Sequence, residues 1–173
     1  FLNLKEYLRM FPSLLEKTGR FRRKGLIVGV SGPIAAGKST ASLFLAGLGA
    51  HEIDVDAIGH KLLRDENVIK KIIECFGSEI VDSTGHLSRR KLACIAFQCD
   101  DSVKKLNDIL HPLIIEATKK EVAESRYEGT ILVINAALLF EAGIDELCDY
   151  IILVTADESV REQRAITRRG WTA

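Results

Sequence analysis

Residues 32–40 of the chain are Gly32-Pro33-Ile34-Ala35-Ala36-Gly37-Lys38-Ser39-Thr40, and the architecture of the rest can be worked out from this stretch. It matches the pattern G-x-x-x-x-G-K-[ST], in which successive backbone N–H groups form a nest for phosphate oxygens. A short apolar run, 26–31, precedes it and a segment with helical spacing follows it. The alternative is a glycine-containing turn that matches the pattern by chance, but such a turn has no reason to lie between an apolar strand and a helix. We therefore predict a phosphate-binding loop that leads into a helix.

The residue types in this loop have separate physical tasks. Gly37 lets the backbone come close to the phosphates, and the helix N-terminus adds the positive end of its dipole. Lys38 supplies a positive charge for the β- and γ-phosphates of ATP, and the Ser39 hydroxyl is a ligand for Mg²⁺. Ala35 and Ala36 require that the middle of the loop uses backbone angles open to alanine. We expect the nucleotide to contact Gly32, Ala35, Ala36, Gly37, Lys38, Ser39 and Thr40.

Strands and helices alternate beyond this loop. The apolar run 26–31 predicts a buried strand, and further strands are expected at 51–53, 130–136 and 150–155. Helices are expected at about 37–46, over most of 57–125, and from a cap at Asp157 through Arg168, with further caps at Ser88 and at Asp100 or Asp101. Strands separated by helices imply a mainly parallel sheet covered on both faces. We therefore predict an α/β fold of the P-loop NTPase type, with three α/β/α layers plus helical substrate-binding and lid segments.

Two classes of phosphate-loop protein do not fit the sequence. A GTPase needs Asn-Lys-x-Asp for guanine, which is absent, and Asp56-Ala57-Ile58-Gly59 lies too close to the loop to be its Asp-x-x-Gly. A larger ATPase or motor usually ends a later strand in Asp, whereas the strand from Ile131 leads to Asn135. A small-molecule kinase remains. Such an enzyme needs a base for the acceptor hydroxyl and arginines for the transferred phosphoryl group.

Candidates for the base and for the arginines are present. Asp54 and Asp56 follow the second strand, whose carboxyl end lies at the same sheet edge as the loop, so we predict that Asp56 accepts the hydroxyl proton. The alternative is that Asp56 caps a helix. Arg164 and Arg168 share a helix face, which suits a lid at about 161–173 that closes over a triphosphate. The alternative is a solvated basic helix.

From residue 26 to about 172 the sequence resembles the dephospho-CoA kinases. Besides the phosphate loop, the resemblance rests on local motifs in a fixed order: Leu48-Gly49 and then Ile53-Asp54-Val55-Asp56, Gly85-His86-Leu87-Ser88-Arg89 with Leu92 and Phe97, His111-Pro112-Leu113-Ile114, Leu138-Leu139-Phe140-Glu141, and Gln163-Arg164 with Arg168. The chain also departs from the family. Ala137 stands where proline is usual, Asn135 where an acidic residue is common, and Arg169 where aspartate is common.

The resemblance implies transfer of phosphate from ATP to the ribose 3′-hydroxyl of dephospho-CoA, giving ADP and coenzyme A in the last step of its synthesis. It implies Asp56 as the base, Lys38 and Mg²⁺ on the phosphates, and Arg164 and Arg168 as lid residues. Asp54, Arg89, His111, Leu138 and Glu141 are expected on the acceptor side, in part within a helical insertion at about 57–125; otherwise, His111 before Pro112 ends a helix. A related P-loop kinase for another nucleoside or small alcohol, and a non-catalytic nucleotide-binding protein, stay open as alternatives.

The charge of the chain is unevenly distributed. Its 173 residues include 24 basic and 24 acidic side chains, yet residues 1–24 carry seven basic and two acidic ones. We predict a basic helical arm at 1–24 that packs on the kinase domain, 25–173, or on a second subunit, so that a homo-oligomer would form. A membrane-surface or targeting helix is the alternative. Position 1 is not Met and the chain stops after Arg168-Arg169, so we expect both ends to be incomplete.

Composition excludes several classes of partner. The net charge of zero argues against a general nucleic-acid binder, and the longest apolar run, 131–140, is too short for a bilayer, which needs about 20 residues. The four cysteines, Cys75, Cys94, Cys99 and Cys148, have no metal-site spacing. Buried, reduced thiols are expected, as is typical of the cytoplasm. A small molecule is therefore the expected partner.

Overall fold

The computed structural model describes residues 25–82, 85–127 and 129–169, without the side chains of Arg168 and Arg169. The predicted arm, 1–24, lies outside the described residues. The chain divides into two compact units: unit 1 contains the residues up to Asp56 and those from Lys119 onward, and unit 2 contains Ala57–Thr118. Unit 2 begins where the helical insertion is expected, and its part in binding an acceptor stays a prediction.

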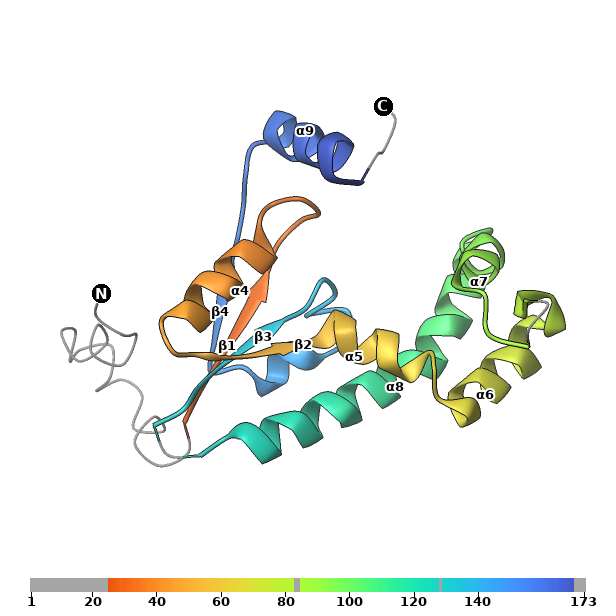
Figure 1. The fold of residues 1–173 in the computed structure, drawn as a ribbon, viewed down its shortest axis with the longest axis horizontal. Helices are drawn as coiled ribbons and strands as arrows, with labels where there is room; N and C mark the ends of the chain where they lie inside the picture. Colours follow the sequence, from red (N-terminus) through yellow and green to blue (C-terminus); the bar gives the residue numbers. More distant parts are fainter. Residues whose placement is uncertain (1–24, 83–84, 128, 170–173) are drawn as a thin grey trace. The chain divides into compact units, whose positions relative to one another are not determined.

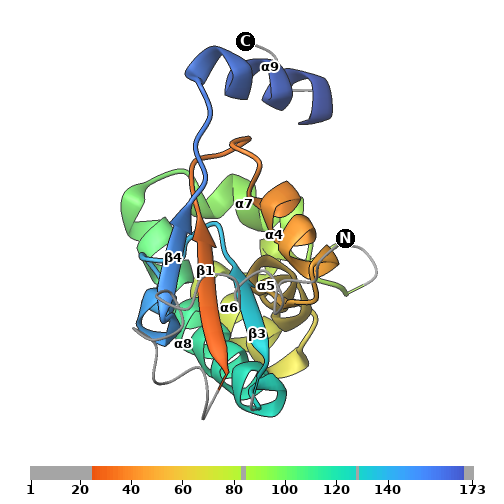
Figure 2. The ribbon, with the colours of Figure 1, turned by 90° about the vertical axis from the view of Figure 1, so that its left-hand side faces the viewer.

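A parallel four-stranded sheet forms the centre of unit 1 (Figure 1). Its strands are β1 (Leu26–Ser31), β2 (His51–Asp54), β3 (Ile131–Asn135) and β4 (Tyr150–Leu153), in the order β2-β3-β1-β4. Figure 2 shows β1 between β3 and β4, and the register places Leu26 opposite Ile131 and Val28 opposite Tyr150. The predicted α/β class with a parallel sheet is confirmed.

The strand β4 corrects one expectation. The sheet was expected to be covered on both faces, but Tyr150, Ile151, Ile152 and Leu153 of β4 are all exposed. The reason is position, because β4 is an edge strand of the sheet and has β1 as its neighbour on one side only. An apolar run identifies a strand but does not say whether the strand is central or at an edge.

The two faces of β1 have different neighbours, because alternate residues of a strand point to opposite faces. On one face Leu26, Val28 and Val30 form a cluster with Ile131 and Val133, and Ala41 and Leu45 of α4 (Lys38–Gly47) pack against it. On the other face a Cβ at Gly29 would lie 2.8 Å from the sulfur of Cys148 and 3.0 Å from Leu139. The strand β1 is therefore covered on both of its faces.

The beginning of β1 is fixed by a half-buried ion pair. The carboxylate of Asp149 accepts a hydrogen bond from the Ile27 N–H at 2.9 Å and from Arg126 Nη2 at 3.1 Å. The same nitrogen of Arg126 also donates to the Gly25 carbonyl at 3.1 Å. The two side chains are only 24% and 12% exposed, so water screens the pair weakly. This network ties β1 to the residue just before β4.

Unit 2 is helical around its own core. Its elements are α5 (Val55–Leu62), which begins in unit 1, α6 (Glu66–Phe76), η1 (Ser78–Ile80), α7 (Arg89–Ala96) and α8 (Asp100–Ser125), which ends in unit 1. The core is apolar and consists of Val68, Ile72, Ile80, Leu92 and Ala96. Ser88 caps α7 as predicted, because its hydroxyl accepts a bond from the Lys91 N–H at 3.4 Å.

Several predicted helix ends are corrected. The helix α5 begins at Val55, so Asp56 lies in its first turn and does not cap it. The helix α8 begins at Asp100, so Asp100 and Asp101 also lie in a first turn, where a carboxylate favours the helix dipole. The last helix, α9 (Glu158–Arg169), follows directly after Asp157. Within the described ranges, no helix is both long enough and apolar enough to cross a membrane.

The helix α8 continues through Pro112, so the expectation that His111 ends a helix is wrong. Proline inside a helix removes one hydrogen bond and costs about 3 kcal/mol. The compensation comes from packing, since Leu110 and Leu113 on either side contribute to the core of unit 2. Tertiary burial therefore outweighs the local preference, and His111 is held within a 26-residue helix.

The prediction of four buried thiols is also wrong. All four cysteines are free, but Cys75, Cys94 and Cys99 are exposed and Cys148 is half-buried. The hydroxyl of Ser102, 3.2 Å from the Cys99 sulfur, lowers the pKa of the Cys99 thiol because a hydrogen bond favours the thiolate. Burial raises the pKa of Cys148 to about 11, since it disfavours the charged form.

Candidate active site

The phosphate-binding loop connects β1 to α4, and its two glycines meet different constraints. Gly32 has φ of 150°, and a Cβ there would lie 2.1 Å from the Val154 carbonyl oxygen, so no side chain fits. That close approach follows from the hydrogen bond of the Val154 N–H to the Ser31 carbonyl at 2.8 Å. Gly37 has φ of 111° directly before α4, a conformation that L-residues rarely adopt. The chain thus turns sharply at both ends of the loop.

The middle of the loop has one alanine in a strained conformation. Ala35 has φ of 61°, the left-handed region, whereas Ala36 closes a turn by donating from its N–H to the Pro33 carbonyl at 3.2 Å. A left-handed conformation costs an L-residue about 1–2 kcal/mol. We expected backbone φ and ψ angles that alanine adopts easily at both positions. Ala35 departs from this expectation, because its positive φ is a strained conformation for alanine.

Two cations lie against the loop, one at the start of α4 and one on α9. Lys38 Nζ donates to the carbonyl oxygens of Gly32 at 2.7 Å and Pro33 at 3.2 Å. Arg164 Nη1, from α9, donates to those of Ala35 at 3.3 Å and Ala36 at 3.2 Å. Helix α9 is thereby joined to the loop, and its arginine lies where phosphate oxygens would bring negative charge.

Asp56 reaches the same region from the first turn of α5. Its side chain is exposed, and its carboxylate accepts a hydrogen bond from the backbone N–H of Ala137 at 3.4 Å. Because Ala137 lies just beyond the carboxyl end of β3, this bond aims the carboxylate along the edge of the sheet where β1 passes into the loop. A carboxylate in this position can accept a proton from a bound hydroxyl.

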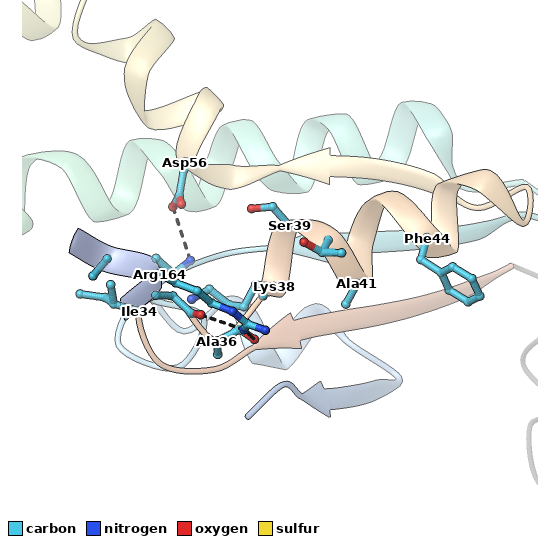
Figure 3. Close-up of a pocket in the computed structure, with 13 residues that line it drawn as sticks. Ile34, Ala36, Lys38, Ser39, Ala41, Phe44, Asp56 and Arg164 are labelled. Carbon is cyan, nitrogen blue, oxygen red and sulfur yellow. Dashed lines mark hydrogen bonds between the residues drawn. The ribbon is translucent and has the colours of Figure 1, made fainter. Parts of the chain in front are cut away.

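These groups line one pocket of about 850 Å³ within unit 1 (Figure 3). Its lining consists of Ile34, Ala35, Ala36, Gly37, Lys38, Ser39, Thr40, Ala41, Phe44, Asp56, Ala137, Arg164 and Ala165. Figure 3 shows the Asp56 carboxylate and the Ser39 hydroxyl on one side and Arg164 across the loop. Most residues predicted to bind nucleotide, and the predicted base, therefore share a single cavity.

The other predicted site residues lie outside this pocket lining. Gly32 begins the loop against the Val154 carbonyl, and Asp54 ends β2. Leu138 and Glu141 are exposed in the turns that follow β3. Arg89 begins α7 and His111 lies inside α8, both in unit 2. Arg168 belongs to α9, and its side chain is outside the described residues.

Asn135, where the chain departs from the resembled family, is buried at the end of β3. Its side-chain N–H donates to a carboxylate oxygen of Glu52 at 3.1 Å. An aspartate here would place two carboxylates against each other, so the amide suits this neighbour. A second departure, Ala137, is exposed, and its backbone N–H is the group that Asp56 uses.

Some lining residues were missed in the sequence. Phe44 is four residues beyond Thr40 on α4, and helical spacing alone places it on the same face. Ala137 contributes through its backbone, which no side-chain pattern reveals. Ile34 and Ala41 lie within or directly after the motif, but at positions where the motif specifies no residue type.

Comparison with known proteins gives a consistent result. A family model described as dephospho-CoA kinase matches residues 26–173. A dephospho-CoA kinase of Fusobacterium nucleatum is 38% identical over 143 residues, which are 83% of this chain and 73% of the relative. One of Chlorobaculum tepidum is 39% identical over 152 residues, 84% of this chain and 73% of the relative. The crystal structure of TT1252 from Thermus thermophilus aligns with a TM-score of 0.72 and 28% identity, over 85% of this chain and 74% of that one.

Proposed function

This chain belongs to the dephospho-CoA kinase family, and from that premise we propose that the pocket beside its phosphate-binding loop holds the triphosphate of ATP. The enzyme is an ATP-dependent kinase of the last step of coenzyme A synthesis. The acceptor group is the ribose 3′-hydroxyl of dephospho-CoA. The observation that carries the proposal is the shared cavity, because it combines phosphate-binding groups with a carboxylate that can serve as the base.

The loop and the two cations bind and orient the phosphates. The backbone N–H groups of residues 37–40, at the N-terminus of α4, bind phosphate oxygens. Lys38 exchanges a loop carbonyl for the β- and γ-phosphates, and Arg164 pairs with the charge that develops on the transferred group. Arg168 completes the lid. Ile34 and Phe44 add apolar surface beside the phosphates.

Asp56 acts on the acceptor. Its carboxylate takes the proton of the 3′-hydroxyl while the hydroxyl oxygen forms a bond to the γ-phosphorus. The bond from the γ-phosphorus to the oxygen shared with the β-phosphate breaks, and ADP leaves with that electron pair. The Ala137 N–H orients the carboxylate.

The protein oxygens at this site are too few to hold Mg²⁺ alone, so the ion would bind together with the phosphate oxygens of the nucleotide. Among the described residues, no cluster of three or more His, Cys, Asp or Glu side chains could hold a metal ion. The pocket nevertheless offers the Ser39 hydroxyl and the Asp56 carboxylate, and magnesium ions usually combine few protein oxygens with phosphate oxygens and water. When bound, the ion neutralises phosphate charge. Ser39 is the residue that would hold it.

The remaining predicted residues are assigned to the acceptor. Arg89 and His111 supply nitrogen donors from unit 2, while in unit 1 Asp54 ends β2 and Leu138 and Glu141 follow β3. All five are exposed or partly exposed, as contacts with a small molecule require. The proposed enzyme is cytoplasmic and acts on a small molecule, without a nucleic-acid or membrane partner. It forms a homo-oligomer through the arm, residues 1–24.

A coupled assay of ADP release tests the function. The purified chain is supplied with ATP and Mg²⁺ and with dephospho-CoA, adenosine, uridine or shikimate in parallel. We expect turnover with dephospho-CoA to exceed that with the other acceptors. Preferential turnover of another acceptor would indicate a related kinase, and ATP binding without turnover would indicate a nucleotide-binding protein. Mass spectrometry of the product identifies coenzyme A directly.

A further inference from the structure

An arginine and a histidine of unit 2 are joined by a short hydrogen bond that the reaction described above does not use. Arg89 Nη2, at the start of α7, lies 2.7 Å from Nε2 of His60 on α5. The guanidinium can only donate, so His60 accepts with Nε2 and carries its proton on Nδ1. The imidazole is therefore neutral in this pair.

The partner leaves the charge of Arg89 intact. Among the residues that the structure describes, no carboxylate forms an ion pair with Arg89, and the side chain is exposed. The hydrogen bond to the imidazole holds one nitrogen of the guanidinium, and the other N–H groups remain as donors on an exposed side chain. The pair thus presents an oriented positive charge, which is the arrangement that recognises a phosphate group.

ATP and dephospho-CoA both carry negatively charged phosphate groups, and the two molecules need separate cationic sites. The triphosphate of ATP is assigned to the pocket of unit 1, and neither His60 nor Arg89 lines that pocket. Dephospho-CoA carries its negative charge on the diphosphate that joins its nucleoside and pantetheine parts. A free cation on unit 2 therefore matches the acceptor rather than the nucleotide donor.

We propose that His60 is a positioning residue, which holds the Arg89 guanidinium in the orientation that pairs with the diphosphate of dephospho-CoA. The inference rests on the proposed function. An untethered arginine of this exposure has many rotamers, and ordering it upon binding reduces affinity. His60 orders Arg89 before the substrate arrives, so its contribution appears in the KM for dephospho-CoA and not in the KM for ATP.

Steady-state kinetics with His60→Ala, His60→Gln, Arg89→Ala and the double variant His60→Ala/Arg89→Ala test this proposal. His60→Ala should raise the KM for dephospho-CoA about tenfold, the effect of losing one hydrogen bond to a charged group, with the KM for ATP and kcat nearly unchanged. Glutamine offers a carbonyl oxygen to Arg89, so His60→Gln should recover most of the loss. In the Arg89→Ala background, His60→Ala should add no further loss, because its effect passes through Arg89.

The control is Arg64→Ala, which removes an exposed arginine of the same unit, and thermal unfolding is measured for every variant. Equal KM values for His60→Ala and Arg64→Ala, or additive effects of His60→Ala and Arg89→Ala, would overturn the positioning role while the proposed function stands. A loss in His60→Ala that glutamine does not recover, or that follows a lowered melting temperature, also overturns it. Absence of both turnover and calorimetric binding of dephospho-CoA in the unmodified chain would instead refute the proposed function, and this inference with it.

Discussion

Arg164 donates a hydrogen bond to the carbonyl oxygen of Ala36 at 3.2 Å, although the two residues are 128 positions apart in the chain. The bond joins the last helix, α9, to the phosphate-binding loop within one unit. A guanidinium at this point is near where the triphosphate is expected to lie. To bind the nucleotide, the Arg164 guanidinium has only to exchange its hydrogen bond with a neutral carbonyl for one with a phosphate oxygen.

Replacing Arg164 should therefore affect the chemical step. We expect Arg164→Ala to lower kcat by about 10²-fold or more, as the loss of one donor to transition-state charge usually does. Arg161→Ala is the matched control, because Arg161 on the same helix donates to the Ala156 carbonyl and does not line the pocket. Its kcat should stay within about twofold of the original value. Similar losses in both variants would assign the effect to helix α9 as a whole.

Asp56→Asn tests the general base. Asparagine keeps an oxygen for the Ala137 N–H but cannot take up the hydroxyl proton, so kcat should fall by about 10²–10⁴-fold. Binding of ATP, measured by calorimetry, should hardly change. Lys38→Ala should show the converse, with weakened ATP binding. Turnover at the original rate in Asp56→Asn would limit Asp56 to a structural role.

Ala35→Gly should stabilise the fold. Glycine relieves the left-handed strain of about 1–2 kcal/mol and loses about 0.5–1 kcal/mol through the greater freedom of the unfolded chain. The net gain is on the order of 0.5–1 kcal/mol, and urea unfolding measures it. The same change at Ala36, which is buried and does not have positive φ, should destabilise. A loss of stability in both variants would show that the strain at Ala35 is negligible.

The main elements of unit 1 could be predicted from local sequence. A short apolar run directly before a glycine-rich phosphate motif is compatible with few structures other than a strand that leads into a loop. The edge position of β4 could not, since the residues Tyr150–Leu153 would read the same in a central strand. The continuation of one helix through Pro112, against the alternative that it ends at His111, could not be predicted for a related reason. Proline is unfavourable locally, and only packing of Leu110 and Leu113 with distant residues compensates for it.

Asn135→Asp should destabilise the end of β3 at neutral pH. The new carboxylate would lie against Glu52 in a buried place, at a cost on the order of 1–3 kcal/mol. Repulsion raises the pKa of such a pair, so the loss is present above that pKa and diminishes as the pH falls through it. Stability measured from pH 8 to pH 5 should show this recovery. Adding Glu52→Gln restores an amide–carboxylate pair and should remove the pH dependence.

The two cysteines with shifted pKa values should differ in alkylation. The lowered pKa of Cys99 gives more thiolate at a given pH, and that thiol is exposed. Cys148, with a pKa of about 11, is largely protonated below that pH and half-buried. With iodoacetamide at pH 7, peptide mass spectrometry should find Cys99 modified well before Cys148. Ser102→Ala should slow the modification of Cys99 and leave Cys148 unchanged, and an equal rate in this variant would contradict the role of the hydroxyl.

The candidate site could be predicted where a side chain has an obligatory chemical task. Lys38, Ser39 and Asp56 are of that kind, and they line one pocket. The backbone N–H of Ala137 and the histidine that holds Arg89 could not be predicted, because neither depends on a residue type that the motif specifies. They became visible only when the fold brought β3 beside β2 and α5 beside α7.

The position of β1 between β3 and β4 has a consequence for folding during synthesis on the ribosome. The strand that carries the phosphate-binding loop is made early, but its anchor Asp149 comes 122 residues after Ile27. Pairings across such distances close large loops and form slowly. The apolar strand therefore leaves the ribosome without its neighbours and must be kept from other chains until β3 and β4 follow. A nascent chain that stops before β3 would have the whole phosphate motif in its sequence and no strand to pair with β1.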